Sequence, residues 1–306
     1  MDKMRVKPYL INSIYELHRL LELSKPEHPL VSVINFAEIK CYSEAYLRSV
    51  AYNFYCIALK KNFEGKMKYG QHYYDFDEGV MTFFSPGQVV TTDIVDNLKL
   101  EGWWLVVHPD FIRQYPLSKN IKNYGYFSYA VNEALHLSEK EEAIVENTMK
   151  NIRQEYGAII DNFSQDVIVS HIELLLNYCN RFYNRQFITR KNSNHDLLAR
   201  IDELLSEYYE TDQFQEAGLP TVQYISEKLN ISSSYLGDML RVLTGQSTQQ
   251  HIHDKLIEKA KEILITTSLS VSEIAYQLGF QYPQSFNKLF KNKTNLSPLK
   301  FRQSFN

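Results

Sequence analysis

Four polar side chains near the end of the chain have types and spacing that suit the reading of a nucleic acid. They stand at positions i, i+3, i+4 and i+7 of one segment: Gln284, Asn287, Lys288 and Lys291. On a helix this spacing places all four on one face. Glutamine and asparagine can pair bidentately with adenine, and lysine can donate to guanine or neutralise a phosphate. The same residues also suit the solvated face of an ordinary surface helix, so the choice depends on their surroundings.

The residues around them predict the helix that would carry this polar face. Phe286, Leu289 and Phe290 recur at helical spacing and would point to a core on the opposite side. Pro283 stands before them, and the first turn is where a helix tolerates proline best. We therefore expect a helix that begins near Pro283, and we count Pro283 with the four polar residues as candidate DNA contacts.

This helix belongs to a structural unit that the chain contains twice, about fifty residues apart. The segments 225–230 and 274–279 match at their apolar positions, and Asn230 and Gly279 stand at the same point of each. Asparagine and glycine enter the left-handed backbone region at low cost, as a tight turn between helices requires. The repeat predicts two copies of one short helix followed by a turn and a longer helix.

A short helix, a tight turn and a second helix form a helix-turn-helix. Ser270 and Glu273 strengthen this interpretation, because Ser-x-x-Glu is a capping box that marks a helix start. We expect one unit at about 219–245 and another at about 270–295. Two such units favour a DNA-binding protein over a solvated surface helix.

The first unit has a less clear polar face than the second. Leu236, Met239 and Leu240 would be its core, while Gly237 lowers helix propensity and Asp238 is repelled by phosphate although it can accept from a cytosine amine. Its candidate DNA contacts are Ser233, Ser234, Tyr235 and Arg241. We expect this helix mostly to position the protein, while the second helix does most of the sequence reading.

Charge must be considered locally in this chain, because its formal net charge is only -3. Residues 196–306 contain 11 Lys and Arg against 13 Asp and Glu, a net of -2. From Gly279 to the end, however, there are five cations and no carboxylate. The second unit is therefore the basic part of an otherwise slightly acidic domain.

Residues 219–304 resemble the DNA-binding domain of the AraC/XylS family of bacterial transcription regulators. The resemblance depends on a long ordered pattern: Ala260–Leu264, Leu269–Ala275, Leu278–Phe280, Ser285–Phe286, Leu289–Lys291 and Ser297–Pro298. It implies that the second helix of each unit enters the major groove and that a long helix, here about Thr248 to Thr266, joins the units. At roughly 1.5 Å per residue that helix spans about 28 Å, near the ~34 Å between successive major grooves on one side of DNA.

From residue 30 to 112, the residue pattern of the chain is typical of a β-protein. Short aromatic and β-branched runs such as 50–57, 80–84 and 103–107 alternate with Gly-containing turn signals. This spacing is typical of a sandwich or a small barrel, and we expect a small β-barrel with flanking helices. A barrel mouth could bind a small-molecule effector of unknown identity.

This part also resembles, more loosely, the cupin-like N-terminal domain of many AraC-type regulators. The residues that carry the resemblance are Tyr74–Gly79, Phe84–Gln88 and His108–Asp110. Metal-dependent cupins have a His-x-His pair, whereas His72 has no histidine two positions away and His108 precedes a proline. We therefore expect no metal and no cofactor. The aromatic residues, including Trp103 and Trp104, suit either a barrel core or the lining of an organic-ligand pocket.

Two helices are expected between the two ends, at about 138–158 and 164–186. The second has an apolar stripe from Val167 to Phe182, which could pack on the barrel or form a homodimer, as such helices do in the family. Thr189–Asn194 has the composition of a linker, and a further helix is expected from His195 to about Glu210. The expected organisation is a sensory domain (1–136), a helical segment (137–188), a linker (189–194) and a DNA-binding domain (195–306).

Length and composition fit a two-domain globular protein of α+β class with an all-α C-terminal domain. The chain has 306 residues, 44% of them hydrophobic, and lacks a signal-peptide or membrane-span pattern. Its three cysteines suit reduced thiols, so a cytoplasmic protein is expected.

The leading hypothesis is a non-enzymatic, effector-responsive transcription regulator that binds double-stranded DNA. Recruitment of RNA polymerase is the commonest outcome in the family, but nothing in the residues separates an activator from a repressor. Two alternatives are a cupin-type enzyme with a helical assembly tail and a protein-interaction module built from the C-terminal repeat. The enzyme would require a metal-ligand or acid/base cluster in residues 30–130.

Overall fold

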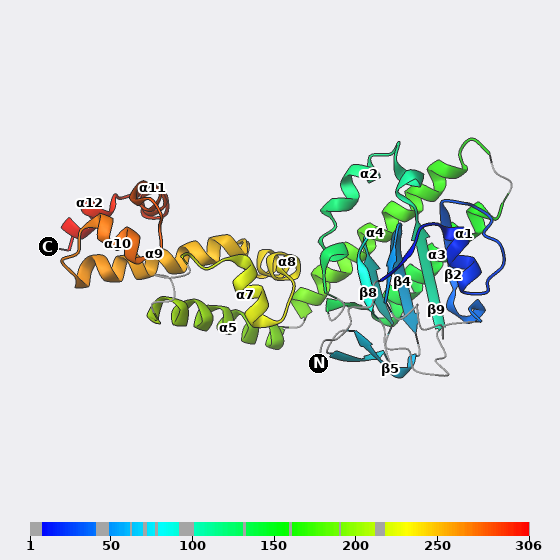
Figure 1. The fold of residues 1–306 in the computed structure, drawn as a ribbon, viewed down its shortest axis with the longest axis horizontal. Coiled ribbons are helices and arrows are strands. Elements are labelled where there is room, and N and C mark those ends of the chain that lie inside the picture. Colours follow the sequence, from blue (N-terminus) through cyan, green and yellow to red (C-terminus); the bar gives the residue numbers. More distant parts are fainter. Residues whose placement is uncertain are drawn as a thin grey trace. The chain divides into compact units, whose positions relative to one another are not determined.

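The computed structural model describes residues 8–40, 49–61, 63–69, 72–76, 79–91, 101–130, 133–158, 161–189, 191–211 and 218–305. The chain divides into two compact units, Met1–Gln186 and Phe187–Asn306. Figure 1 shows both units and labels many of their elements. The N-terminal unit contains the sheets, and the C-terminal unit is helical.

Among its described residues, the N-terminal unit has two sheets and a two-stranded hairpin. The larger sheet has the order β10-β7-β4-β9-β2, with neighbouring strands antiparallel throughout. A three-stranded sheet has the order β1-β3-β8, and β5 pairs with β6. The strands are β1 Tyr9–Ile11, β2 Val31–Asn35, β3 Ser49–Tyr52, β4 Tyr55–Lys61, β5 Phe63–Tyr69, β6 His72–Phe76, β7 Val80–Phe84, β8 Val89–Thr91, β9 Glu101–Val107 and β10 Leu135–His136.

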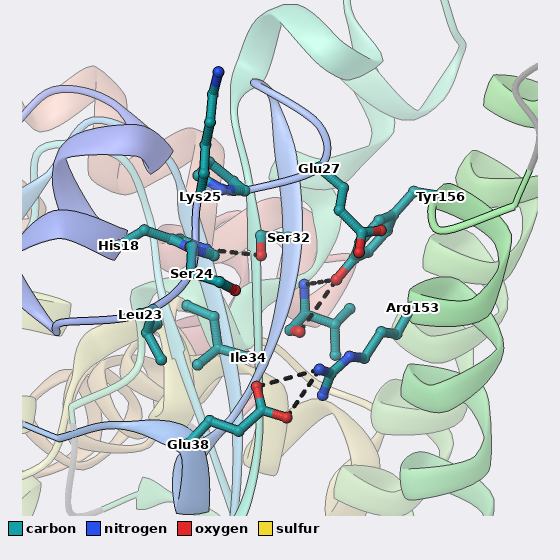
Figure 2. Close-up of a pocket in the computed structure, with 12 residues that line it drawn as sticks. His18, Leu23, Ser24, Lys25, Glu27, Ser32, Ile34, Glu38, Arg153 and Tyr156 are labelled. Atoms are coloured by element: carbon teal, nitrogen blue, oxygen red, sulfur yellow. Dashed lines mark hydrogen bonds and ion pairs between the residues drawn. The ribbon is translucent and has the colours of Figure 1, made fainter.

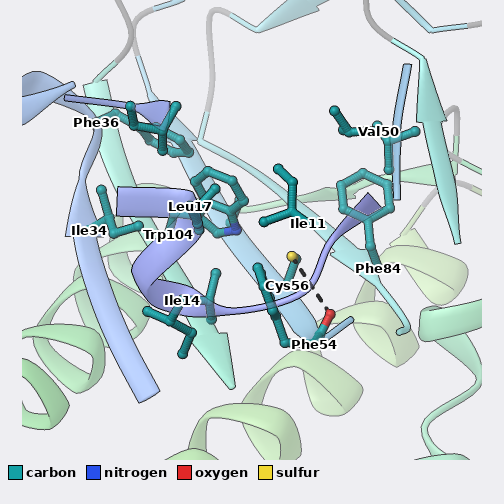
Figure 3. Packing of buried hydrophobic residues seen from close by; sticks show 14 of the residues in the cluster. Ile11, Ile14, Leu17, Ile34, Phe36, Val50, Phe54, Cys56, Phe84 and Trp104 are labelled. Carbon is teal, nitrogen blue, oxygen red and sulfur yellow. Dashed lines mark hydrogen bonds between the residues drawn. The ribbon is translucent and has the colours of Figure 1, made fainter. Parts of the chain in front are cut away.

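The two larger sheets share one apolar core, shown in Figure 3. Ile11 and Val50 reach it from the three-stranded sheet, while Cys56 and Trp104 reach it from the five-stranded sheet. Helix α1 (Ile14–Leu20) covers this core with Ile14 and other apolar residues. The N-terminal fold is thus held by side chains that interdigitate between two sheet faces.

The opposite face of the five-stranded sheet is buried as well. Along β4 the alternate residues Ile57 and Leu59 lie outside that core and are at most 1% exposed. Helices α3 (Glu139–Tyr156) and α4 (Ser164–Thr189) cover this side: the Tyr156 hydroxyl accepts from the Val33 amide at 2.8 Å, and Cys179 Sγ lies 3.6 Å from Met81 Sδ. Burial on both faces explains why these strands are apolar almost throughout.

The predicted closed barrel is not what the described strands show. They form separate open sheets, and the two larger ones meet through side chains instead of edge-to-edge hydrogen bonds. Regularly spaced strands occur in both sandwiches and barrels, so spacing alone could not choose between them. Sheet-rich structure with flanking helices is confirmed for this part of the chain, whereas barrel closure is not.

A network of charged side chains joins α3 to the sheet. The Lys61 ammonium on β4 lies 2.6 Å from Glu142 and 2.5 Å from Glu146, and Lys150 lies 2.7 Å from Glu146. Lys150 also lies over the Trp103 ring. Burial alone would raise the pKa of Glu146, but hydrogen bonds from Lys150 and Lys61 outweigh it and lower this pKa to about 2.

The described residues of the C-terminal unit are helical and include the two predicted helix-turn-helix units. The helices are α5 Lys191–Glu210, α7 Val222–Leu229, α8 Ser233–Thr244, α9 Thr248–Thr266, α10 Val271–Gln277, α11 Pro283–Thr294 and α12 Pro298–Gln303. The pairs α7–α8 and α10–α11 are the two copies, and α9 has the bounds that the sequence predicts for the joining helix.

The predicted linker at 189–194 overlaps the ends of two helices. Helix α4 continues to Thr189, and α5 begins at Lys191, three residues before the predicted linker ends. The segment contains neither glycine nor proline, so its sequence has no residue that would end a helix.

Helix α8 has one residue that weakens it without an evident packing need. Gly237 lies in its middle, and a Cβ added there would meet only Thr248 Oγ1, at the ordinary contact distance of 3.9 Å. Gly245 differs, because it ends α8 with a φ of +74°, in the left-handed region that favours glycine.

Within the described ranges, no helix is both long and apolar enough to cross a membrane.

The charged network on α3 predicts a specific pH dependence of folding. Because the pKa of Glu146 is lowered from its ordinary 4.5 to about 2, its contribution to stability is present above pH 4.5 and is lost as the pH falls through about 2. The network lies near solvent, so we expect Glu146→Gln to cost only about 1 kcal/mol at pH 7. Urea unfolding at pH 7 and pH 3, followed by fluorescence of Trp103 and Trp104, measures this cost at each pH.

A matched control is Glu139→Gln, an exposed carboxylate of α3 outside the network. We expect it to leave the pH dependence as it is in the unmodified protein. Equal pH profiles for Glu146→Gln and the unmodified protein would contradict the assigned role of Glu146.

Replacing Gly237 with alanine should stabilise the C-terminal unit. Alanine has the higher helix propensity, and its methyl group fits against Thr248, so we expect a gain of up to about 1 kcal/mol. Gly245→Ala is the opposing control, because the left-handed backbone there makes a loss of about 1 kcal/mol the expected result. Thermal unfolding followed by far-UV circular dichroism gives both values, and a destabilised Gly237→Ala would show that α8 requires glycine.

Candidate nucleic-acid interface

The second unit begins and turns as its sequence predicts. The Ser270 hydroxyl accepts from the Glu273 amide at 3.2 Å, and the Glu273 carboxylate accepts from the Ser270 amide at 2.7 Å, which completes the capping box. Gly279 has a φ of +83°, and Ala275 is fully buried where α10 approaches its neighbours. These features set the entry to α11.

Helix α11 has the two faces that its sequence predicts. Phe286 and Phe290 are fully buried, and their rings form a series with Phe280 and Phe301 at centroid distances of 5.4 to 5.7 Å. The side of the helix away from this aromatic core is polar. Its exposed residues are Gln284, Asn287, Lys288 and Lys291, and Pro283 is half-buried at the first helical position.

The first unit has the same build with a different turn chemistry. Asn230 ends α7 with a φ of +56°, at the position where Gly279 stands in the second unit. Leu236, Met239 and Leu240 are fully buried, as their spacing predicts. The two units are therefore structural repeats and not only sequence repeats.

The candidate contacts of the first unit lie in mixed environments. Ser233 is exposed, but its hydroxyl bonds to that of buried Ser226 at 2.8 Å. Tyr235 is half-buried, with its ring 5.1 Å from that of Phe187. Ser234 is half-buried, and the exposed Arg241 lies 3.8 Å from Asp238. Ser233, Tyr235 and Arg241 thus each have an intramolecular contact.

Helix α9 places the two units on one rigid element. Its apolar residues Leu256, Ala260 and Leu264 belong to the core that also contains Ile274 and Phe290 of the second unit. At its start, Ser247 and Gln250 form a capping box. The Thr244 hydroxyl, at the end of α8, lies 2.9 Å from His251 Nε2 on the first turn of α9.

Two of the five cations after Gly279 have intramolecular partners that the sequence did not reveal. Lys293 lies 2.5 Å from Asp254 of α9, and Arg302 donates from Nε to the Leu264 carbonyl at 2.9 Å. Lys288, Lys291 and Lys300 are exposed. The basic character of the second unit is therefore concentrated on the polar face of α11 and on α12.

One exposed aromatic residue beside this face was missed by the sequence reasoning. Tyr282 immediately precedes α11 and is 60% exposed. A tyrosine hydroxyl at the start of a reading helix can contact a phosphate or a sugar. Its position one residue before Pro283 was the available signal, but an aromatic residue there is more readily interpreted as core.

The N-terminal unit has a small polar cleft between α1, β2 and α3, shown in Figure 2. At its floor, His18 Nδ1 lies 2.7 Å from the Ser24 carbonyl and Nε2 lies 3.0 Å from the Ser32 hydroxyl. Because a carbonyl only accepts, the neutral ring has its proton on Nδ1 and accepts from Ser32. Burial lowers the pKa of His18, which favours this neutral form. The histidine thus joins three segments of the fold.

The residues singled out for a cupin-type metal site do not form one in the described part of the chain. There, no three His, Cys, Asp or Glu side chains are placed to hold a metal ion. His108 instead accepts from the Asp110 amide at 3.2 Å and caps the turn that follows β9. The side chain of His72, and the segment Asp77–Glu78, lie outside the described residues.

The comparison with protein families concerns the C-terminal unit. Residues 225–304 match the model of a family described as "Helix-turn-helix domain". An uncharacterized HTH-type transcriptional regulator of Pseudoalteromonas carrageenovora is 32% identical over 32% of this chain and 56% of its own length. The Msm operon regulatory protein of Streptococcus mutans is 37% identical over 27% of this chain and 30% of its own length. The chain thus spans about half, or less, of the length of these curated relatives.

Among solved structures, the C-terminal domain of the two-component response regulator yesN from Fusobacterium nucleatum is 34% identical. The structural match covers 35% of this chain and 98% of that domain, with a TM-score of 0.31. The residues that match the family model include the helices of both helix-turn-helix units, apart from the start of α7. Residues 225–304 are therefore a helix-turn-helix domain of the AraC type.

Proposed function

We propose that this protein regulates transcription by binding a specific double-stranded site, with α8 and α11 in two successive major grooves. The observation that carries the proposal is the exposed polar face of α11, formed by Gln284, Asn287, Lys288 and Lys291 opposite a buried aromatic core. Glutamine, asparagine and lysine at this spacing supply the donors and acceptors that the major groove reads. A second copy of the unit supports a site that covers two grooves.

The two reading helices would contribute unequally. On α8, Arg241 has Asp238 within 3.8 Å, so part of its charge is compensated before any phosphate approaches. On α11, the first turn presents Gln284 and the third presents Lys291, and both side chains are exposed. We infer that α11 determines most of the sequence preference, whereas α8 contributes mainly to affinity and orientation.

The N-terminal unit would sense a signal, as a cupin-like effector domain does. Its separate apolar core supports an independent folding unit. Homodimer formation is also proposed, but the apolar stripe of α4 supports it less than expected. Ile172, Leu176 and Cys179 are fully buried, and Cys179 contacts Met81 of the protein's own sheet, so a dimer would have to use other residues.

RNA polymerase is the proposed partner in activation, and a DNA target would place the protein in the cytoplasm. No catalytic role is proposed.

The direct test is selection of DNA by the full-length protein from a library of genomic fragments, followed by footprinting of the recovered sites. Two protected segments about one helical turn apart on one side of the duplex are the expected result. Absence of any sequence enrichment over bulk DNA would overturn the proposal. The positions of the recovered sites would also identify the regulated genes.

Removal of the Gln284 amide should affect specificity more than general affinity. We expect Gln284→Ala to cost about 1 to 3 kcal/mol on the selected site and to relax base preference at one position. Binding to random duplex should change little, because an amide that reads a base contributes little elsewhere. Fluorescence-anisotropy titrations on both duplexes measure the difference. Equal losses on both would exclude base reading by Gln284.

Removal of the Lys291 charge should have the complementary effect. A lysine that neutralises a phosphate contributes on every sequence, so Lys291→Ala should weaken binding to all duplexes and reduce the salt dependence, log K against log[salt], by about one unit. Lys259→Ala is the matched control, because that cation lies on α9 and pairs with Glu262 at 3.0 Å. An unchanged salt slope for Lys291→Ala would assign Lys291 a role other than phosphate contact.

A further inference from the structure

One carboxylate on α9 contacts both helix-turn-helix units at once. Asp254 Oδ2 accepts from Gln246 Nε2 at 3.1 Å, and Gln246 lies in the turn that ends the first unit. Asp254 Oδ1 lies 2.5 Å from the Lys293 ammonium, near the C-terminal end of α11. Each oxygen therefore serves a different unit, although Gln246 and Lys293 are far apart in the sequence.

Asp254 occupies the part of α9 where the contacts of the two units meet. The preceding turns of α9 hold the first unit, through His251 and the end of α8. The following turns, from Leu256 onward, belong to the apolar core of the second unit. Apolar packing tolerates small rotations of a helix, whereas a hydrogen-bonded charge pair is directional. A bridge at this point restricts how α11 can turn relative to the first unit.

We propose that Asp254 is a positioning residue that fixes the separation and angle of the two reading helices, and so the spacing of the DNA boxes that this protein accepts. The inference rests on the proposed function, since it concerns the same two-groove site. On this proposal, Lys293 pairs with Asp254 within the protein and does not contact a DNA phosphate. Asp254 would then determine which half-site spacing is bound, without touching DNA.

The Asp254–Lys293 pair is partly exposed to solvent, so we expect its loss to lower DNA affinity only modestly. The dependence of binding on the distance between the two DNA boxes is therefore the more informative measurement. We expect Asp254→Ala and Lys293→Ala each to weaken binding to the selected two-box duplex about 3- to 10-fold. Binding to a duplex with the α11 box intact and the other box randomised should change less than 2-fold, because a single box imposes no spacing.

The experiment uses the full-length chain and duplexes derived from its selected site, with one or two base pairs added or removed between the boxes. The unmodified protein should show a sharp optimum at the natural spacing, and the two single variants should show a flatter profile. Glu262→Ala is the matched control, because it removes an α9 ion pair whose partner, Lys259, lies on the same helix. It should leave the optimum unchanged.

Reversal of the pair tests the geometry independently of stability. Asp254→Lys with Lys293→Glu restores opposite charges across the same gap, and the Gln246 amide can turn to present its oxygen. The double variant should recover the sharp spacing optimum that each single substitution loses. Thermal unfolding of every variant separates this recovery from a general effect on folding.

Three outcomes would overturn the proposal. If Asp254→Ala strengthens binding to all duplexes, the carboxylate restrains a phosphate contact by Lys293 and does not position α11. If the single variants keep the natural spacing optimum, or if the double variant fails to recover it while folding normally, the bridge does not set the spacing. Failure of the unmodified protein to enrich any DNA would instead refute the proposed function itself.

Discussion

The structure of the C-terminal unit depends on one apolar contact surface, the inner face of α9. Leu256, Ala260 and Leu264 lie against Ile274 and Phe290, and all five are at most 1% exposed. Burial of such side chains contributes roughly 1.5 to 3 kcal/mol for each large residue. A typical hydrogen bond contributes less, about 0.5 to 1.5 kcal/mol. Because a small helical pair cannot bury its own apolar face, each helix-turn-helix requires α9. The polar face of α11 is therefore a consequence of which side α9 covers.

The backbone turns set the remaining geometry. Asn230 and Gly279 have left-handed φ values at matching points, and Gly245 and Asn295 do so at the ends of α8 and α11. These residues end each helix at a defined position, so the chain reverses within a few residues. Turn residues and apolar packing together give the two units the same shape despite different surface residues. Function can then differ between the units, as the Asp238–Arg241 pair on α8 and the exposed lysines on α11 indicate.

Much of the C-terminal unit could be predicted from the sequence, because its determinants are local. Helical periodicity separated Phe286 and Phe290 from Gln284 and Lys288, and the bounds of α9 agreed with the prediction. Local patterns also identified the capping box at Ser270, which depends on residues three positions apart. Such interactions depend on spacing within one element, and spacing is what a sequence displays directly.

The features that escaped prediction are those that join distant segments. The Lys293–Asp254 and Tyr156–Val33 contacts connect residues 39 and 123 positions apart, and no local pattern marks them. The arrangement of the N-terminal strands as open sheets with a shared core also depends on strand order, which alternation alone leaves undetermined. Likewise, polar composition alone did not locate the end of α4 at Thr189 or the start of α5 at Lys191.

These long-range pairs bear on how a domain of slightly negative charge can bind DNA. Asp254 compensates Lys293, and Asp238 lies close to Arg241, so part of the positive charge is balanced within the protein. The cations that stay exposed on α11, Lys288 and Lys291, lie beside Gln284 and Asn287 on the face that would read bases. Nonspecific attraction grows with the number of phosphates neutralised, whereas discrimination grows with base contacts. If the proposed function holds, internal neutralisation of Lys293 and Arg241 would lower affinity for random DNA more than affinity for a matched site, and would favour specificity over strength.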